Sequence, residues 1–381
     1  MGSPVTLSVI KADVGGYVGH SRVHPEMLAK AEELLQQQRG KLLIDSTVLV
    51  CGDDIDLVMT HERGNDHPAI HQLAWDTLTA AADIAHRLKM YGAGQDLQAD
   101  AFSGNVKGMG PGVAEMTFIE RPSEPILIFC ADKCAPGAWN LPLYKMFADP
   151  MNSPGLVIDT KMNQGATFEV FDAVEGKSLK LNTPEEVYLL LTFIGSTGRY
   201  LIKNIYMRFC NDVAATGSVQ RLKDVAGRYI GKDDPVLVVR GQAGFPALGE
   251  ITEAFTLGHT TAGWMRGSHQ GPLMPCSFDT ARPVRFDGPP RVICAGFQLA
   301  HGKLLGPVDI FDNPAFDRTR ARCNAVADYL RAHGVFEPHR LHPEEMEYTT
   351  LPEVQKQVAH RWESEDKLPS KVGAGVGGDF D

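Results

Sequence analysis

The chain has 381 residues, of which 43% are hydrophobic and 22% are charged, a composition typical of a globular protein with a large buried core. Its formal net charge of −10, from 37 Lys and Arg against 47 Asp and Glu, argues against a nucleic-acid partner, because such a partner requires a basic surface. No run reaches the roughly 18 apolar residues of a membrane span and the first residues lack a signal-peptide pattern, so we expect a cytoplasmic protein without membrane association.

Apolar periodicity divides the first 130 residues into helices and strands. Apolar residues at helical spacing predict helices, and short apolar runs bounded by glycine, proline or aspartate predict strands. Gly52-Asp53-Asp54 separates two such runs and indicates a hairpin turn, while the continuous run 126–129 indicates a strand buried on both faces. In chain order we expect a strand at 5–10, a helix at 24–43, strands at 47–51 and 55–60, a helix at 68–91, and a strand pair at 112–120 and 125–130.

The second part of the chain mixes helices and strands without strict alternation. Thr183-Pro184-Glu185-Glu186 matches a capping box, the typical start of a helix. The expected elements are helices at 187–194 and 218–229, a strand at 236–240, a strand-rich region at 274–310 and a helix at 313–333. We therefore predict one α/β domain over 1–362, with antiparallel sheets between outer helices, and a flexible tail over 363–381.

Three weaker patterns can be explained without a functional role. Seven cysteines without regular spacing indicate reduced thiols. His67 and His71 have the i, i+4 spacing of metal ligands, but without the glutamate of a zinc-protease motif ordinary surface histidines are favoured. The glycine-rich segment 102–111 matches no nucleotide-binding fingerprint, and is either a phosphate cradle or a flexible surface loop.

Acidic or amide side chains follow turns or strand ends at five separate places. Oxygen ligands with an occasional histidine suit hard cations such as Mg²⁺. An Asp-Asp pair at a hairpin tip is more often an ordinary turn, so the hypothesis of a metal centre depends on the repetition. The five places are Asp13 with His20, Asp53 with Asp54, Gln95, Asp132 with Lys133, and Asp233 with Asp234.

Residues 227–234, Gly-Arg-Tyr-Ile-Gly-Lys-Asp-Asp, combine an amine with carboxylates. Lys232 is a candidate imine-forming amine and Tyr229 a candidate proton shuttle. Attack on a carbonyl requires a neutral lysine, whereas the adjacent Asp233 and Asp234 favour its charged form. A bound Mg²⁺ would neutralise the carboxylates and resolve this conflict. A solvated turn is the alternative for this segment taken alone.

Seven motifs, in order over about residues 5–360, resemble the bifunctional fructose-1,6-bisphosphate aldolase/phosphatase family of archaea and deeply branching bacteria. The motifs are Asp13 through His20, Cys51-Gly-Asp-Asp54, Tyr91-Gly-Ala-Gly-Gln95, Ser103-Gly-Asn105, Ala131-Asp-Lys133, Gly227 through Asp234, and Arg240-Gly-Gln-Ala243. The resemblance implies a four-layer α-β-β-α sandwich and a homo-octamer. It also implies one active site that condenses dihydroxyacetone phosphate with glyceraldehyde 3-phosphate and then removes the C1 phosphate, a gluconeogenic step that yields fructose 6-phosphate.

The resemblance also implies roles for individual residues. Lys232 corresponds to the Schiff-base lysine, Tyr229 to the acid/base of the aldol reaction, and Asp13 to the base for the phosphatase water. Several Mg²⁺ ions are implied, with Asp13, His20, Asp53, Asp54, Gln95, Asp132, Asp233 and Asp234 as their ligands. The implied contacts to the sugar and triose phosphates are His20, Tyr91, Gly104, Asn105, Asp132, Lys133, Gln242, Ala243, Arg266, Asp287 and Tyr348.

Two other functions compete with the bifunctional enzyme. A Mg²⁺-dependent sugar phosphatase without aldolase activity would share the carboxylates, and a catalytically silent Lys232 would distinguish it. A non-enzymatic metal-binding or scaffold protein is the second alternative, and a metal-dependence assay on fructose 1,6-bisphosphate would separate it from the other two.

Overall fold

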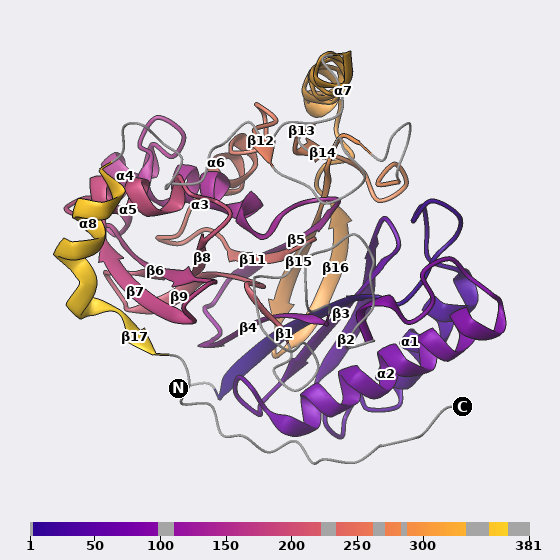
Figure 1. The fold of residues 1–381 in the computed structure, drawn as a ribbon. Coiled ribbons are helices and arrows are strands. Elements are labelled where there is room, and N and C mark those ends of the chain that lie inside the picture. Colours follow the sequence, from indigo (N-terminus) through magenta and orange to yellow (C-terminus); the bar gives the residue numbers. More distant parts are fainter. Residues whose placement is uncertain are drawn as a thin grey trace.

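Two β-sheets lie face to face in the centre of the molecule, and helices cover the outer face of each (Figure 1). This computed structural model describes residues 3–97, 110–221, 234–261, 271–282, 288–332 and 350–364. The layers run helix, sheet, sheet, helix, which confirms the predicted α-β-β-α sandwich. In these parts of the chain no helix is both long and apolar enough to cross a membrane.

The smaller sheet has the strand order β10-β4-β1-β3-β2, and every neighbouring pair is antiparallel. Helices α1 (Pro25–Gln36) and α2 (Pro68–Arg87) cover its outer face. Alternation along β1 explains both contacts, because Leu7 and Val9 face the second sheet while Ile10 and Ala12 face the helices. The strands are β1 (Pro4–Asp13), β2 (Asp45–Cys51), β3 (Asp54–His61), β4 (Gly112–Ile119) and β10 (Gln220–Arg221).

The larger sheet has the order β14-β15-β5-β11-β9-β8-β6-β7-β17, with β16 also paired to β15. Its pairs are antiparallel except β14 with β15, so the sheet is mixed. The strands are β5 (Glu124–Asp132), β6 (Ala166–Asp172), β7 (Lys177–Asn182), β8 (Tyr200–Met207), β9 (Asp212–Gly217), β11 (Val236–Arg240), β14 (Met274–Pro275), β15 (Arg291–Ala300), β16 (Lys303–Asp309) and β17 (Glu363–Ser364).

The second helical layer covers the outer face of the larger sheet. Phe129 of β5 and Phe168 of β6 pack there against Met146 and Phe193 in one buried core. The helices of the larger-sheet side and the C-terminal region are α3 (Asn140–Ala148), α4 (Gly155–Ile158), α5 (Val187–Ile194), α6 (Leu248–Glu253), α7 (Asp317–Ala332) and α8 (Leu351–Val358). Strands β12 (Thr260–Thr261) and β13 (Gly271–Pro272) form a separate two-stranded sheet.

Strands are present at both positions of the pair expected at 112–120 and 125–130, but the expected pairing between them is wrong. β4 belongs to the smaller sheet and β5 to the larger one, so the short connection between them crosses from one layer to the other. The apolar run in β5 explains this placement, because Ile128 packs between the sheets and Phe129 packs against the helices. A strand that is apolar on both faces needs cover on both sides.

Other boundaries differ for local reasons. The helix expected at 24–43 ends at Gln36, and Gly40 with φ 75° lies in the turns that follow. The capping-box prediction is wrong, since the Thr183 hydroxyl donates to the Ala166 carbonyl oxygen at 3.1 Å and Glu186 is the N-cap of α5. The first residues of the helix expected at 218–229 include β10 instead, and 222–229 lie outside the described residues.

The two histidines at helical spacing have separate structural roles. His67 is the N-cap of α2 and accepts from the Ala69 N–H at 3.3 Å. His71 Nε2 lies 3.3 Å from Glu115 Oε1 and forms an ion pair with it. Glu363 and Ser364, expected in the tail, pair with β7 as β17, while 365–381 lie outside the described residues.

Candidate active site

The inner faces of the two sheets change from apolar to charged at one end of the sandwich. Along β1 the inward positions alternate through Val9 to Lys11 and Asp13, and the last two are buried. On β5 the same alternation leads from Cys130 to Asp132, which is fully buried. Ionisable side chains at these buried positions are costly unless charged partners surround them, which marks this end of the sandwich as the candidate site.

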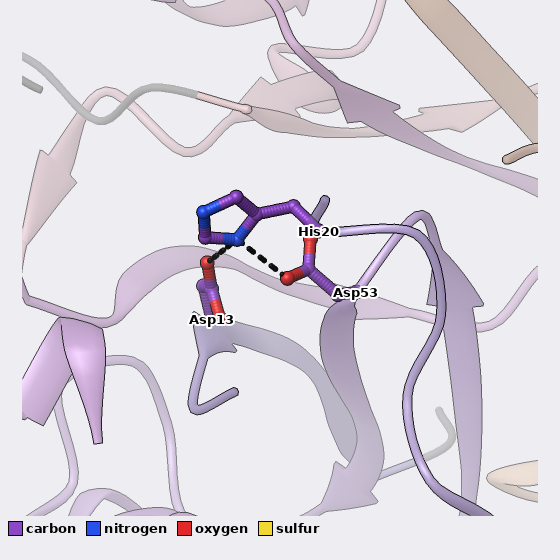
Figure 2. Close-up of side chains that lie close together, drawn as sticks. All are labelled: Asp13, His20 and Asp53. Atoms are coloured by element: carbon purple, nitrogen blue, oxygen red, sulfur yellow. Dashed lines mark hydrogen bonds and ion pairs between the residues drawn. The ribbon is translucent and has the colours of Figure 1, made fainter. Parts of the chain in front are cut away.

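The first of two groups, called the acidic groups below, consists of the carboxylates of Asp13 and Asp53 and the imidazole of His20. Figure 2 shows these three side chains converging. His20 Nδ1 lies 2.7 Å from Asp53 Oδ2 and 3.4 Å from Asp13 Oδ2. Asp13 ends β1, and its Oδ1 accepts from the Gly15 N–H at 2.9 Å. Its own N–H donates to Asp96 Oδ2 at 2.9 Å, so the carboxylate is fixed by both its neighbours and its backbone.

Burial and charge shift the pKa values of this first group in opposite directions. Burial, together with repulsion from Asp53, raises the pKa of Asp13 to about 6. Burial alone lowers the pKa of His20, but hydrogen bonds to Asp13 and Asp53 outweigh it and raise the pKa to about 10. Burial raises the pKa of Asp53, but attraction to Lys133 and hydrogen bonding to His20 outweigh it and lower the pKa.

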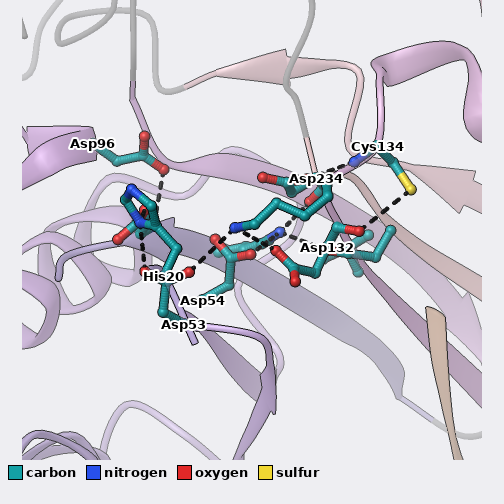
Figure 3. A network of polar contacts seen from close by, with 12 residues as sticks. His20, Asp53, Asp54, Asp96, Asp132, Cys134 and Asp234 are labelled. Atoms are coloured by element: carbon teal, nitrogen blue, oxygen red, sulfur yellow. Dashed lines mark hydrogen bonds and ion pairs between the residues drawn. The ribbon is translucent and has the colours of Figure 1, made fainter. Parts of the chain in front are cut away.

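The second group consists of Asp54 of β3, Asp132 of β5, and Asp234, which lies two residues before β11 (Figure 3). One carboxylate oxygen from each lies within 4.8 Å of the other two. Neither oxygen of Asp132 accepts a hydrogen bond within the described part of the chain. Its contacts are ion pairs, with Lys133 Nζ at 2.9 Å and with Arg291 Nη1 at 3.6 Å.

Two buried lysines link the carboxylates. Lys133 Nζ lies 3.5 Å from Asp53 Oδ1 as well as beside Asp132, so it bridges the two groups. Lys11 Nζ lies 2.8 Å from Asp54 Oδ2. Burial lowers the pKa of each lysine, but the surrounding carboxylates outweigh this and raise both pKa values well above normal, so both amines are charged.

The hairpin between β2 and β3 approaches Asp132 closely, and this requires glycine. A Cβ at Gly52 would lie 2.4 Å from Asp132 Oδ2, and Gly52 has φ 66°. Gly16 is similarly confined, since its Cβ would lie 2.6 Å from Asp53 Cβ. Side chains at either position would push the carboxylates of the two groups apart.

Backbone strain is concentrated among the predicted site residues. Non-glycine residues rarely adopt positive φ, and the strain persists only where surrounding contacts enforce it. Among the described residues, five predicted site positions have this conformation: His20 at 51°, Lys133 at 64°, Asp234 at 47°, Gln242 at 65° and Ala243 at 54°. The strain is consistent with a functional role for these positions.

The structure brings together all seven of the predicted metal ligands that it describes, together with Tyr91 and Lys133. Gln95 is buried close to His20, because a Cβ at Gly92 would lie 2.9 Å from Gln95 Oε1 and 3.2 Å from His20 Cε1. The Tyr91 ring meets the His20 ring edge to face, with centroids 4.6 Å apart. The grouped residues are Asp13, His20, Asp53, Asp54, Tyr91, Gln95, Asp132, Lys133 and Asp234.

Other predicted site residues are elsewhere or outside the described parts. β11 pairs Val236 with Cys130 and Arg240 with Ile126, so Gln242 and Ala243 lie beyond the end of β11 that is remote from Asp132. There the Gln242 carbonyl accepts from Arg121 Nη1 at 2.7 Å. The residues outside the described parts are Gly104, Asn105, Tyr229, Lys232, Asp233, Arg266, Asp287 and Tyr348.

Three residues of the cluster were missed by the sequence analysis, namely Lys11, Asp96 and Arg291. The signal for Lys11 was present, since it continues the inward positions Val5, Leu7 and Val9 of an apolar strand. Arg291 is fully buried and pairs across the sheet with Asp132. Its role depends on that pairing, which the sequence does not reveal.

The donor set fits a hard divalent cation. Carboxylates with one imidazole are the ligands such cations prefer, and Asp132 has two buried oxygens that accept no hydrogen bond from the described residues. Asp13, His20 and Asp53 would hold one ion, and Asp54, Asp132 and Asp234 another. Cations at these positions would attract an anionic substrate group such as a phosphate ester.

Comparison with known proteins identifies close relatives along the whole fold. The chain matches the family described as fructose-1,6-bisphosphatase over residues 4–363. A fructose-1,6-bisphosphate aldolase/phosphatase of Moorella thermoacetica is 59% identical over 362 residues, or 95% of each chain. Proteins of the same name from Ignicoccus hospitalis and Methanothermobacter marburgensis are 55% identical; the alignments cover 97% and 95% of this chain, and 95% and 99% of theirs.

Proposed function

The chain belongs to the fructose-1,6-bisphosphate aldolase/phosphatase family, and from this we infer that it is a bifunctional enzyme with lyase and phosphatase activities. Its substrates are sugar phosphates. The relatives carry both activities in their names, which favours the bifunctional enzyme over a phosphatase without aldolase activity. The detailed chemistry proposed below rests on the motifs and on the geometry of the carboxylate groups.

We propose that Lys232 forms a Schiff base with dihydroxyacetone phosphate, which then condenses with glyceraldehyde 3-phosphate. The position of Asp234 is the observation that supports this role. Asp234 N–H donates to the Cys134 carbonyl at 2.8 Å, and Asp234 Oδ1 accepts from the Cys134 N–H at 2.8 Å. Lys232 precedes Asp234 by two residues in the sequence, and Asp234 belongs to the second acidic group. Tyr229 would carry the proton of the aldol step.

For hydrolysis, we propose that the two acidic groups hold Mg²⁺ ions beside the C1 phosphate. The ions supply charge neutralisation at the phosphoryl group. Lys133 contributes a fixed positive charge between the groups. Asp13, with a pKa of about 6, is ionised at neutral pH and can accept the proton of the attacking water. Asp233 completes the proposed ligand set, and the proposed substrate contacts remain those implied by the resemblance.

We also propose that the enzyme is a cytoplasmic homo-octamer. Large apolar side chains are exposed on the outer layer of the larger sheet, where Met151 is 91% exposed, Tyr188 82% and Ile158 78%. Large apolar side chains with this degree of exposure are candidates for contacts between subunits. Light scattering should give a mass several times that of the chain, and a mass near 41.6 kDa would contradict the proposal.

Borohydride trapping with dihydroxyacetone phosphate tests the Schiff base. Peptide mapping should find the label on Lys232, and a label on Lys133 or on no lysine would contradict the assignment. Lys232→Ala and Tyr229→Phe should abolish condensation and retain hydrolysis of supplied fructose 1,6-bisphosphate. Asp13→Ala is the matched variant, because it should lose hydrolysis while still forming the imine.

A further inference from the structure

Lys11 is buried between the two sheets, where its ammonium group contacts three separate segments of the chain. Nζ lies 2.8 Å from Asp54 Oδ2, donates to the Ala131 carbonyl at 2.9 Å, and also donates to the Asp234 carbonyl. The side chain has 0% exposure. An ammonium group has three N–H donors, so these three acceptors use them all. Lys11 therefore has no donor left for a substrate.

The position of Lys11 resembles that of a metal ion. Its three acceptors are oxygens of Asp54 on β3, of Ala131 on β5, and of Asp234, which lies two residues before β11. Asp54 and Asp234 are members of the second acidic group. Asp56 is opposite Lys11 in the register of β1 with β3 and adds a further buried carboxylate nearby. A fixed cation here reduces the repulsion among the carboxylates and also repels an incoming divalent ion.

We propose that Lys11 is a positioning residue that serves as a built-in cation of the second acidic group and thereby sets how strongly this group requires and binds divalent metal. The proposal rests on the metal site proposed above. With the lysine present, the carboxylates stay in place without metal. Without it, the protein would depend on the divalent ion to offset the same repulsion.

Arg240 provides a matched control in the same protein. It is also fully buried on β11, with Nη2 2.8 Å from Glu124 Oε2 and Nη1 2.7 Å from Asp212 Oδ2. It lies at the end of β11 remote from Asp234, so its partners include no member of the acidic groups. Loss of Arg240 should destabilise the protein to the same extent with and without metal.

The test compares unfolding midpoints of the full-length protein in EDTA and in saturating Mg²⁺ for the wild type, Lys11→Met and Arg240→Met. In EDTA, Lys11→Met should lower the midpoint by roughly 6–10 °C, because it leaves buried carboxylates uncompensated. Saturating Mg²⁺ should recover more than half of that loss, whereas Arg240→Met should lose the same amount in both conditions. Equal losses for Lys11→Met in both conditions would overturn the proposal.

Calorimetric titration with Mg²⁺ provides a second measurement. Because the fixed cation repels the ion, Lys11→Met should bind Mg²⁺ at least about tenfold more tightly than the wild type does. An unchanged or weaker affinity would overturn the proposal. If Lys11→Met does not fold, Lys11→Met combined with Asp54→Asn should fold, since both charges are gone; an unfolded double variant would also overturn it. A wild type that Mg²⁺ does not stabilise would instead refute the proposed metal site.

Discussion

The two acidic groups at the end of the sandwich differ in the cations that balance them. Asp13 and Asp53 share a histidine, and the His20 and Asp13 side chains each retain about a tenth of their exposure. Asp54 and Asp132 face the side chains of Lys11 and Arg291, which are fully buried. Only Lys133 contacts both groups within the described part of the chain.

This difference separates a responsive group from a fixed one. The balance of the first group depends on protons at Asp13 and His20, so pH and metal can change its charge. In the second group the balancing cations are side chains of the protein itself, Lys11, Lys133 and Arg291, which are buried inside the sandwich. We infer that the charge of the first group changes when metal and substrate bind. The second group holds the neighbouring ends of β3, β5 and β11 together.

Metal removal should have the largest effect and should act on both groups. Hydrolysis of fructose 1,6-bisphosphate should fall by about 1000-fold or more in excess EDTA, because the carboxylates would then repel the phosphate. Mg²⁺ added back should restore it. Hydrolysis that continues at the original rate in EDTA would contradict a metal role for either group.

Neutralising one carboxylate in each group should affect stability in opposite directions. In EDTA, Asp132→Asn should destabilise the protein by about 3–5 kcal/mol, since it removes the carboxylate that faces the buried Arg291 and one of the two carboxylates that pair with Lys133. Asp13→Asn should stabilise it by about 2 kcal/mol above pH 6, because the ionised carboxylate is disfavoured there. Both should lose hydrolysis. Denaturant unfolding measures the two changes, and the same sign for both would remove the distinction between the groups.

The first group should contribute a pH dependence with two separate steps. In the folded protein the pKa of Asp13 is raised from the ordinary 3.8 to about 6, so Asp13 keeps its proton to a higher pH than it does in the unfolded chain. The stability of the metal-free protein should therefore fall as pH rises from about 4 to 6. His20, raised to about 10, should add a second loss as pH rises from about 6.5 to 10. Subtracting the Asp13→Asn profile from that of the wild type isolates the first loss, and a flat difference between pH 4 and 6 would contradict it.

The smallest effect is expected for the histidine. His20→Gln should weaken Mg²⁺ binding by about tenfold, within the range seen when a group that ligates or orients a metal is lost. Because the carboxylates remain, hydrolysis at saturating Mg²⁺ should stay within about tenfold of the wild type. Calorimetry and steady-state rates measure the two values. A loss as large as that of Asp132→Asn would show that the first group depends on the imidazole more than its geometry suggests.

Much of the fold follows from local pattern. Alternation along β1 and the helical spacing in α1 and α2 predict those elements and the faces they bury. The placement of β4 and β5 in different sheets does not follow from local pattern. A short connection can have the same sequence pattern whether it joins two strands of one sheet or crosses from one sheet to the other. The early end of α1 and the bond between Thr183 and Ala166 also depend on contacts that a local pattern omits.

The candidate site divides in the same way. Aspartates at turns and strand ends are visible one motif at a time, and the family resemblance joins them into a single centre. Arg291 was missed because its importance comes from pairing with Asp132, 159 positions earlier in the chain. Lys11 could have been found, since a lysine at an inward position of an apolar strand requires a buried anionic partner.

The location of bound metal tests the account most directly. Crystals soaked in Mn²⁺, which takes the same oxygen ligands as Mg²⁺, reveal each ion by its anomalous scattering. We predict one peak within bonding distance of Asp13 and Asp53 and another within bonding distance of Asp54, Asp132 and Asp234, with Lys11 still bound to Asp54. Absence of a peak at either group, or a metal ion in the place of the Lys11 ammonium, would contradict the division into a responsive and a fixed group.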